Sequence, residues 1–115
     1  MFEIELPIEK GGVSYINSDS KQIDPDLIIC AKPGYIRHTK FPYQCYYVHM
    51  NIHSGTLYET LINMPDFLTV DQSDRYNEIF TKLITHYNAH TESEEIILQS
   101  LILELINMLN KAVDI

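Results

Sequence analysis

Arginine, histidine and tyrosine side chains occur in this sequence within, or directly after, short apolar segments. An arginine pairs a carboxylate or a phosphate through two parallel hydrogen bonds, and a tyrosine ring offers a flat face to a sugar. Small-molecule pockets combine aromatic walls with a few polar groups of this kind. We therefore predict a ligand-binding site that is built from Tyr15, Arg37, His38, Tyr47 and His49.

An ordinary structural role is the alternative for each of these side chains. Tyr47 and His49 occupy alternate positions in an apolar–polar pattern, and such positions face solvent when a strand is half-buried. Arg37 is also able to form an ion pair with one of the 16 acidic residues. The sequence leaves both alternatives open.

Histidines and cysteines do not show the spacing of a metal centre or of a catalytic site. His38, His49 and His53 have no acidic residue at ligand spacing. The pair His86 and His90 lacks the intervening glutamate of a zinc protease and a third ligand. No serine or cysteine carries a local nucleophile–base signature. We therefore expect no metal site and no other cofactor, and we expect that the protein is not an enzyme.

Length and charge restrict the class of protein further. The 115 residues correspond to one domain, and 8 basic against 16 acidic residues give a net charge of −8. Nucleic-acid binding needs clustered lysines and arginines, so we expect no direct nucleic-acid binding by this chain. The N-terminus has acids where a signal peptide has bases, and the longest apolar runs are shorter than a membrane span. With Cys30 and Cys45 as free buried thiols, these features predict a cytoplasmic protein without a membrane partner.

The part of the chain up to about residue 70 consists of short strand-like segments separated by turns. Segment 56–64 has mixed apolar spacing and fits either a strand or a short helix. Elsewhere we predict strands at 2–9, 13–16, 27–31 and 45–52, a hairpin tip at 17–20 with a return strand that starts at Ile23, and a short segment carrying Arg37 and His38 after a Pro33-Gly34 turn. This succession of short strands is typical of a barrel or a sandwich.

From Ser73 onward the apolar residues recur at three and four positions, which is the period of an amphipathic helix. We predict one helix from Ser73 to Tyr87 and a break at 88–90. A second helix follows from about Glu92 toward the end of the chain, and the segment 91–94 has the form of a capping box at its start.

The second predicted helix is apolar over about half of its circumference, and its apolar residues form two seams. One seam is Leu98, Leu101, Leu105, Met108 and Ala112, and the other is Ile102, Ile106, Leu109 and Val113. A helix that packs on one small domain needs only one such stripe. We therefore predict that the second seam forms a homodimer interface, and the alternative is that both seams are buried within one subunit.

Four segments of the sequence together carry a resemblance to a known family, namely Glu9–Asn17, Pro25–Gly34, Arg37–Thr39 and Cys45–His49. Together they resemble the N-terminal sensor domain of AraC-type transcription regulators, and the helical layout over 73–113 is similar as well. The resemblance implies a mainly β fold with a C-terminal α part, in which a partial cupin-like barrel is followed by an antiparallel helical hairpin. It also implies a single sensor and dimerisation domain over 1–115, with the β part at about 1–70 and the hairpin at about 71–115.

The chain departs from the cupin pattern at several positions. Gly34 matches the second cupin motif, but Asp26 stands at its first glycine, Lys32 at its proline and Arg37 at its histidine. The first cupin motif, His-x-His with a later Glu, and the helix-turn-helix domain of the family are not found in this sequence. The first strands of a full barrel are therefore expected to be missing.

The resemblance implies the function of a ligand sensor. A small molecule such as a sugar would bind in the barrel and change how the helices act on a partner or on an attached DNA-binding domain. An alternative of a different class is a small stand-alone cupin, either a metal-dependent enzyme or a sugar-binding protein.

Overall fold

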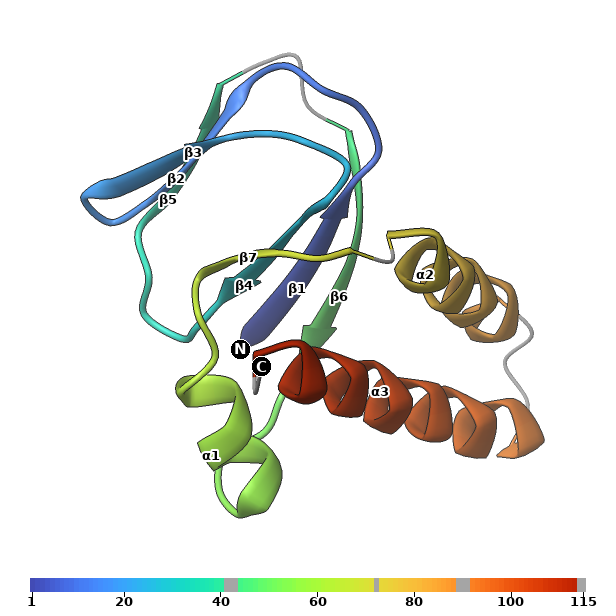
Figure 1. Cartoon of the computed structure of the whole chain (residues 1–115). Coiled ribbons are helices and arrows are strands. Elements are labelled where there is room, and N and C mark those ends of the chain that lie inside the picture. The colour runs from blue at the N-terminus through green and yellow to red at the C-terminus, as the bar shows by residue number, and fades with distance from the viewer. Residues whose placement is uncertain (41–43, 72, 89–91, 114–115) are drawn as a thin grey trace. The chain divides into compact units, whose positions relative to one another are not determined.

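The computed structural model describes residues 1–40, 44–71, 73–88 and 92–113, and the chain divides into two compact units, Met1–Asp71 and Gln72–Ile115. In the described residues, the first unit contains seven antiparallel strands in two sheets and one short helix, and the second contains two helices (Figure 1). The division falls where the sequence changes from the period of a strand to that of a helix. The expected order, strands first and helices at the C-terminal side, is confirmed.

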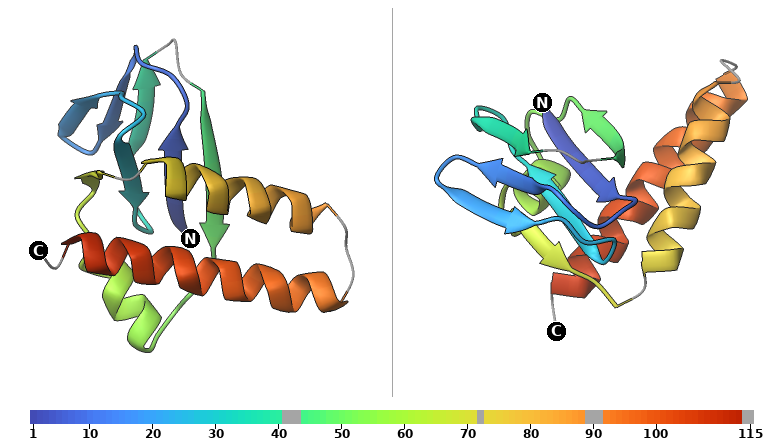
Figure 2. Two further views of the ribbon diagram at one scale, coloured as in Figure 1. Left: turned by 45° about the vertical axis from the view of Figure 1, so that its right-hand side comes forward. Right: turned by 90° about the horizontal axis from the view of Figure 1, so that it is seen from above.

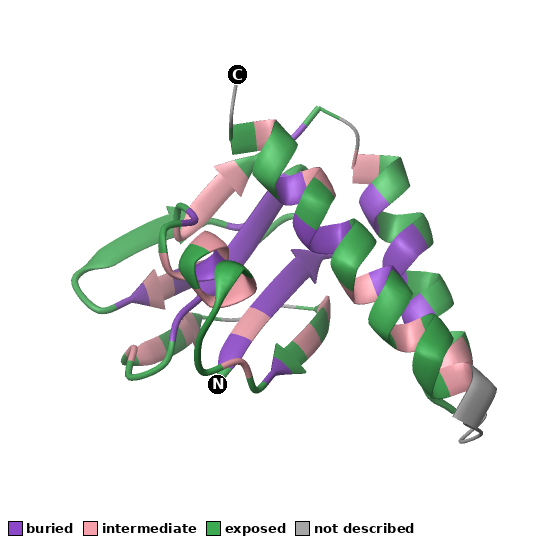
Figure 3. Cartoon of the chain, turned by 90° about the horizontal axis from the view of Figure 1, so that it is seen from below, coloured by how far each residue is buried: buried purple, intermediate pink, exposed green. Residues whose placement is uncertain are grey.

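The larger sheet has the strand order β6-β1-β4-β7, formed by β1 (Phe2–Pro7), β4 (Leu27–Ala31), β6 (Cys45–Met50) and β7 (Phe67–Thr69). The central strand β4 reads Leu-Ile-Ile-Cys-Ala and is buried at every position, which explains why it is apolar throughout rather than alternating. Buried residues concentrate in β1 and β4, the two inner strands of this sheet (Figure 3).

The smaller sheet has the order β3-β2-β5, formed by β2 (Val13–Ile16), β3 (Asp19–Gln22) and β5 (Arg37–Lys40). The prediction that the return strand starts at Ile23 was wrong, because Ile16 pairs directly with Asp19 across a two-residue turn. Asn17 has a φ of 53°, a left-handed conformation that asparagine tolerates and that suits such tight hairpins.

The two sheets face each other within the first unit, and apolar side chains fill part of the space between them. Ile16 of the smaller sheet packs in one cluster with Leu27 and Ile29 of the larger sheet, and Tyr35 and Phe67 complete this cluster. Burial of each large aliphatic side chain contributes roughly 1.5–3 kcal/mol. This cluster joins the sheets on one side and leaves the other side to polar residues.

The turn at Pro33-Gly34 follows β4 as predicted. Gly34 has a φ of +84°, which only glycine adopts without strain, and the amide of Tyr35 donates to the carbonyl oxygen of Lys32 over 3.3 Å. Lys32 itself is 4% exposed, and its ammonium donates to the carbonyl oxygen of Met64 and, over 2.7 Å, to the carboxylate of Asp66. This contact attaches the segment before β7 to the end of β4.

The segment left open between strand and helix forms helix α1 (Thr56–Ile62). Its neighbour β7 was not predicted, because three residues after the Pro65-Asp66 break are too short to show a period. β7 pairs antiparallel with β4 from Ile29–Phe67 to Leu27–Thr69. The predicted strand 45–52 ends two residues earlier, at Met50.

The second unit consists of helix α2 (Ser73–Tyr87) and helix α3 (Glu92–Val113), which lie side by side (Figure 2). Both helices have the predicted bounds. The buried residues of α2 recur at three and four positions, namely Tyr76, Ile79, Phe80 and Leu83. Thr91, the first residue of the predicted capping box, lies outside the described residues.

Only part of the predicted dimer seam of α3 is exposed on the surface. Ile106 and Leu109 are 3% and 0% exposed, Ile102 is half-buried, and Val113 is 41% exposed. Two of the four residues are thus already buried in the chain, because both seams belong to one wide apolar face. Other large apolar residues of α3 are exposed instead, namely Ile96, Ile97 and Leu103.

Helix α3 also corrects the expectation about membrane-spanning length. Residues Glu94–Val113 form a helical stretch of 20 residues with a mean hydropathy of 1.5, which is long and apolar enough to cross a membrane. The expectation counted uninterrupted apolar runs, whereas a helix tolerates occasional polar residues such as Ser100, Glu104 and Asn107. Length and composition alone are weak evidence, since a helix that packs in a globular protein meets the same criteria.

Candidate functional site

Arg37 connects the two sheets of the first unit through two carboxylates. Its guanidinium, carried by β5, donates to Glu3 on β1 and, over 2.6 Å, to Glu5 on the same strand. Glu3 and Glu5 are two positions apart, so both side chains leave β1 on the face that looks toward β5. Glu5 is 6% exposed, and the guanidinium is what compensates the burial of its charge.

Strand β6 contributes the exposed part of the same arrangement. His49 lies opposite Glu3 in the register, and its Nε2 lies 2.8 Å from Oε1 of that glutamate. Tyr47 lies opposite Glu5, and its ring centroid is 5.1 Å from that of His49. We call Glu3, Glu5, Arg37 and His49 the inner polar cluster. Tyr47 is 60% exposed and borders this cluster on the solvent side.

Tyr15 and His38 lie on the opposite face of the smaller sheet. They form a cross-strand pair between β2 and β5 with their ring centroids 5.6 Å apart. His38 follows Arg37 directly, and neighbouring side chains of a strand point to opposite faces. The structure therefore brings Arg37, Tyr47 and His49 together and separates Tyr15 and His38 from them, so the five predicted residues do not form one site.

The inner polar cluster is held together mainly by residues that the sequence did not single out. Glu3 and Glu5 alternate with Phe2, Ile4 and Leu6, which is the pattern of a strand with one face in water. The alternative role of Arg37, an ion pair with acidic residues, is the one that the structure shows. Its guanidinium is occupied by protein carboxylates, so a ligand would meet the exposed rings of Tyr47 and His49 first.

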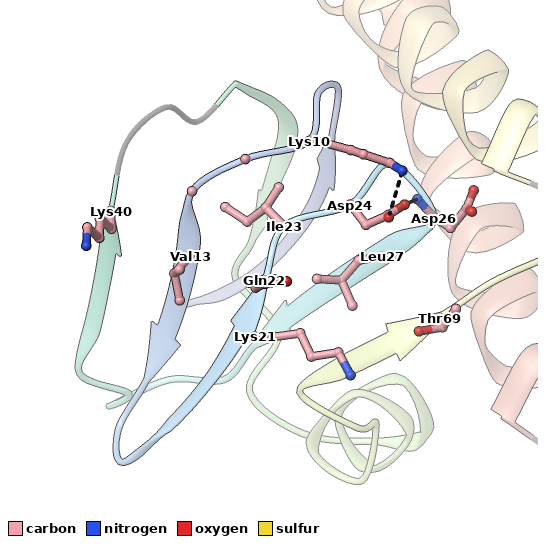
Figure 4. Close-up of a pocket in the computed structure, with 12 residues that line it drawn as sticks. Lys10, Val13, Lys21, Gln22, Ile23, Asp24, Asp26, Leu27, Lys40 and Thr69 are labelled. Carbon is pink, nitrogen blue, oxygen red and sulfur yellow. Dashed lines mark hydrogen bonds and ion pairs between the residues drawn. The ribbon is translucent and has the colours of Figure 1, made fainter.

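A separate groove of about 760 Å³ opens at another place in the first unit (Figure 4). Sites for small molecules typically have volumes of roughly 300–1,000 Å³. The groove is lined by the loop before β2, by β3 and the segment that follows it, and by the ends of β4, β5 and β7. Its charged lining residues are Lys10, Lys21, Asp24, Asp26 and Lys40. None of the five predicted ligand-binding residues lines it.

Among the described residues, no three histidine, cysteine or acidic side chains lie close enough together to hold a metal ion. Burial raises the pKa of the Cys30 thiol to about 12, and Asp66 adds to this rise while Lys32 opposes it. Cys45 is free as well but only half-buried, with its Sγ 4.0 Å from Glu5. His86 contacts Glu94 of α3, and its predicted helical neighbour His90 lies outside the described residues.

No protein-family model matches this chain, and no curated protein matches it.

Proposed function

We propose that this chain is the ligand-sensing and dimerisation domain of an AraC-type transcription regulator, with a partial cupin-like β-unit and a helical hairpin. In this proposal the chain acts in the cytoplasm, binds a small molecule in the β-unit, and binds no nucleic acid and no membrane itself. Ligand binding changes how the hairpin presents itself to a second copy or to an attached DNA-binding domain.

The observation that carries the proposal is the ligand-sized groove in the β-unit of a chain that also carries a separate helical hairpin. A sensor needs a place for its effector and an element that reports occupancy. The sequence runs that resemble the AraC-type sensor domains lie in the β-unit, and the hairpin follows in the same order as in those proteins.

The position of Arg37 supports a role in sensing rather than in metal catalysis. The resemblance aligns Arg37 with a histidine of the second cupin motif, and a guanidinium is not a metal ligand. In this chain Arg37 pairs with Glu3 and Glu5. Arg37 thus forms ion pairs with carboxylates at the sequence position where the resemblance would put a metal-binding histidine.

The exposed apolar residues of α3 support dimerisation. Ile96 is 71% exposed and Leu103, one heptad later, is 50% exposed, so both lie along the same side of the helix. We assign the contact with a second copy to these two residues, in place of the predicted seam that contains the buried Ile106 and Leu109. A symmetric contact would place Leu103 near its own copy.

A fusion experiment tests the proposal. The chain is joined to a DNA-binding domain that represses a reporter promoter only as a dimer, and repression is measured in cells. We expect repression by the parent fusion, loss of repression with Leu103→Glu, and unchanged repression with Glu104→Lys, a matched charge change on the polar side of α3. Absence of repression by a parent fusion that accumulates to normal levels would contradict the proposal.

A sugar-binding protein without a regulatory role is a second candidate, and the ring pair of Tyr47 and His49 favours it. Exposed aromatic rings beside a carboxylate are suited to stack on a sugar and to accept hydrogen bonds from its hydroxyls. A sugar-dependent rise in melting temperature that disappears in Tyr47→Ala, combined with no repression by the fusion, would favour this candidate.

A further inference from the structure

The cations of the first unit divide into two groups. Lys32 and Arg37 are bound to partly buried carboxylates within the protein. The other three cations of the described residues up to Asp71 all line the groove, namely Lys10, Lys21 and Lys40. In a chain of net charge −8, this gathers the remaining positive charge of the unit around one ligand-sized opening.

Not all of these lysines are equally available to a ligand. Lys10 lies 3.9 Å from Asp24, and Oδ1 of Asp24 also accepts a hydrogen bond from the amide of Asp26. Figure 4 shows Lys40 directed away from the middle of the groove, whereas Lys21 extends from β3 toward β7. Lys21 is therefore the cation that is best placed to meet a charged group within the groove.

The middle of the groove is apolar. The side chain of Leu27 lies between Lys21 and the Lys10–Asp24 pair, and that of Ile23 lies beside this pair (Figure 4). Both residues are buried, with exposures of 3% and 2%, so only a small part of each side chain faces the groove, as its apolar floor. A ligand that fits this arrangement needs a compact anionic group and an apolar or ring-shaped part beside it.

We propose that the groove binds a small organic anion, in which a carboxylate or phosphate pairs with Lys21 and the remainder of the molecule lies on Ile23 and Leu27. This inference rests on the proposed function, since it gives the chemical class of the effector. It differs from the sugar expected from the sequence, and it places the effector away from the inner polar cluster.

The test is a titration of the full chain with phenyl phosphate, with phenyl glucoside as the uncharged counterpart. We expect binding of phenyl phosphate that weakens with added salt, and no measurable binding of phenyl glucoside. Removing a charge-assisted hydrogen bond in Lys21→Gln should weaken phenyl phosphate binding by roughly tenfold or more. Lys82→Gln is the matched control, because Lys82 is an exposed lysine of α2 that forms an ion pair with Glu78, away from the groove lining.

Amide chemical shifts locate the ligand independently of affinity. Addition of phenyl phosphate should shift the amide signals of Gly12, Ile23 and Leu27. Failure of phenyl phosphate to bind, or equal binding by the parent and Lys21→Gln, would overturn the inference. Repression by the fusion without anion binding would support the proposed function and contradict the anion site. Anion binding without repression would support the anion site and contradict the proposed function.

Discussion

At the scale of single residues, Arg37 shows how alternation along a strand decides what a side chain does. Its neighbour His38 lies on the other face of β5, so only Arg37 meets Glu3 and Glu5. The ion pairs lie between the sheets, where the carboxylate of Glu5 has little access to water. Arg37 therefore stabilises the packing of one sheet on the other.

Replacing Arg37 by Met should lower the free energy of unfolding by about 2–3 kcal/mol, because two glutamates lose a charged partner while the site remains partly buried. Urea unfolding followed by circular dichroism measures this change. Lys40→Met in the same strand is the matched control and should change the free energy by less than about 0.5 kcal/mol, as an exposed substitution does. Equal stability of both variants would show that the ion pairs of Arg37 contribute little.

The two cysteines should differ in reactivity. The thiolate is the reactive form, and the pKa of Cys30, raised by burial to about 12, keeps that thiol neutral at pH 8. A thiol reagent at pH 8 should therefore modify Cys45 in the native protein and both cysteines in denaturant. In Cys45→Ser, native labelling should fall to background. Rapid native labelling of Cys30, detected by peptide mass, would rule out its burial.

At the scale of secondary-structure elements, β7 and the segment before it depend on a contact with β4. Lys32 has a side chain that is only 2% exposed, whereas that of its partner Asp66 is 27% exposed. The hydroxyl of Tyr35 also donates to Asp66 over 3.0 Å, and burial together with this hydrogen bond raises the pKa of Tyr35. If Lys32 is removed, water can reach the carboxylate of Asp66. If Asp66 is removed, water can hardly reach the ammonium of Lys32.

This difference predicts unequal effects of removing either partner. Asp66→Ala leaves a buried ammonium without its carboxylate and should cost about 3–5 kcal/mol of unfolding free energy. Lys32→Met leaves a carboxylate that water reaches and should cost only about 1–3 kcal/mol. The double variant should be no less stable than Asp66→Ala alone. Thermal and urea unfolding compare the three proteins, and a larger loss for Lys32→Met would invert the interpretation.

At the scale of the whole molecule, the chain consists of a β-unit and a helical hairpin that are compact by themselves. Two large apolar residues of α3, Ile96 at 71% and Leu103 at 50%, are exposed on a different side of the helix from its buried residues Leu105 and Leu109. The contact with a second copy proposed above is assigned to this side of α3.

Sedimentation distinguishes the exposed residues of α3 from the buried ones. Leu103→Glu should give a folded monomer, because it places two like charges in a symmetric apolar contact. Ile106→Glu should instead unfold the protein or lower its stability by several kcal/mol, because Ile106 is 3% exposed and the charge would be buried. Glu104→Lys should leave the dimer intact. A monomeric parent, or a dimeric Leu103→Glu, would exclude this surface.

Much of the secondary structure could be predicted from local sequence. The central strand Leu27–Ala31, the Pro33-Gly34 turn and both long helices occur where their patterns place them, because periodicity and backbone preferences act over a few residues. The order of a β part before a helical part follows from the same signals. Strand β7 and the early start of β3 gave no such signal, since one is very short and the other is uniformly polar and exposed.

Which side chains share a site was decided by the tertiary structure. Alternation along the strand predicts that Arg37 and His38 lie on opposite faces of β5. The tertiary structure shows that the face with Arg37 is the one directed at Glu3 and Glu5 on β1, and that the pairing of β1 with β6 adds His49. The groove has the same origin, because Lys21, Leu27 and Thr69 come from three segments of the chain. Sequence reports the preferences of neighbouring residues, whereas a site is a set of distances between residues far apart in the chain, and these are determined by packing.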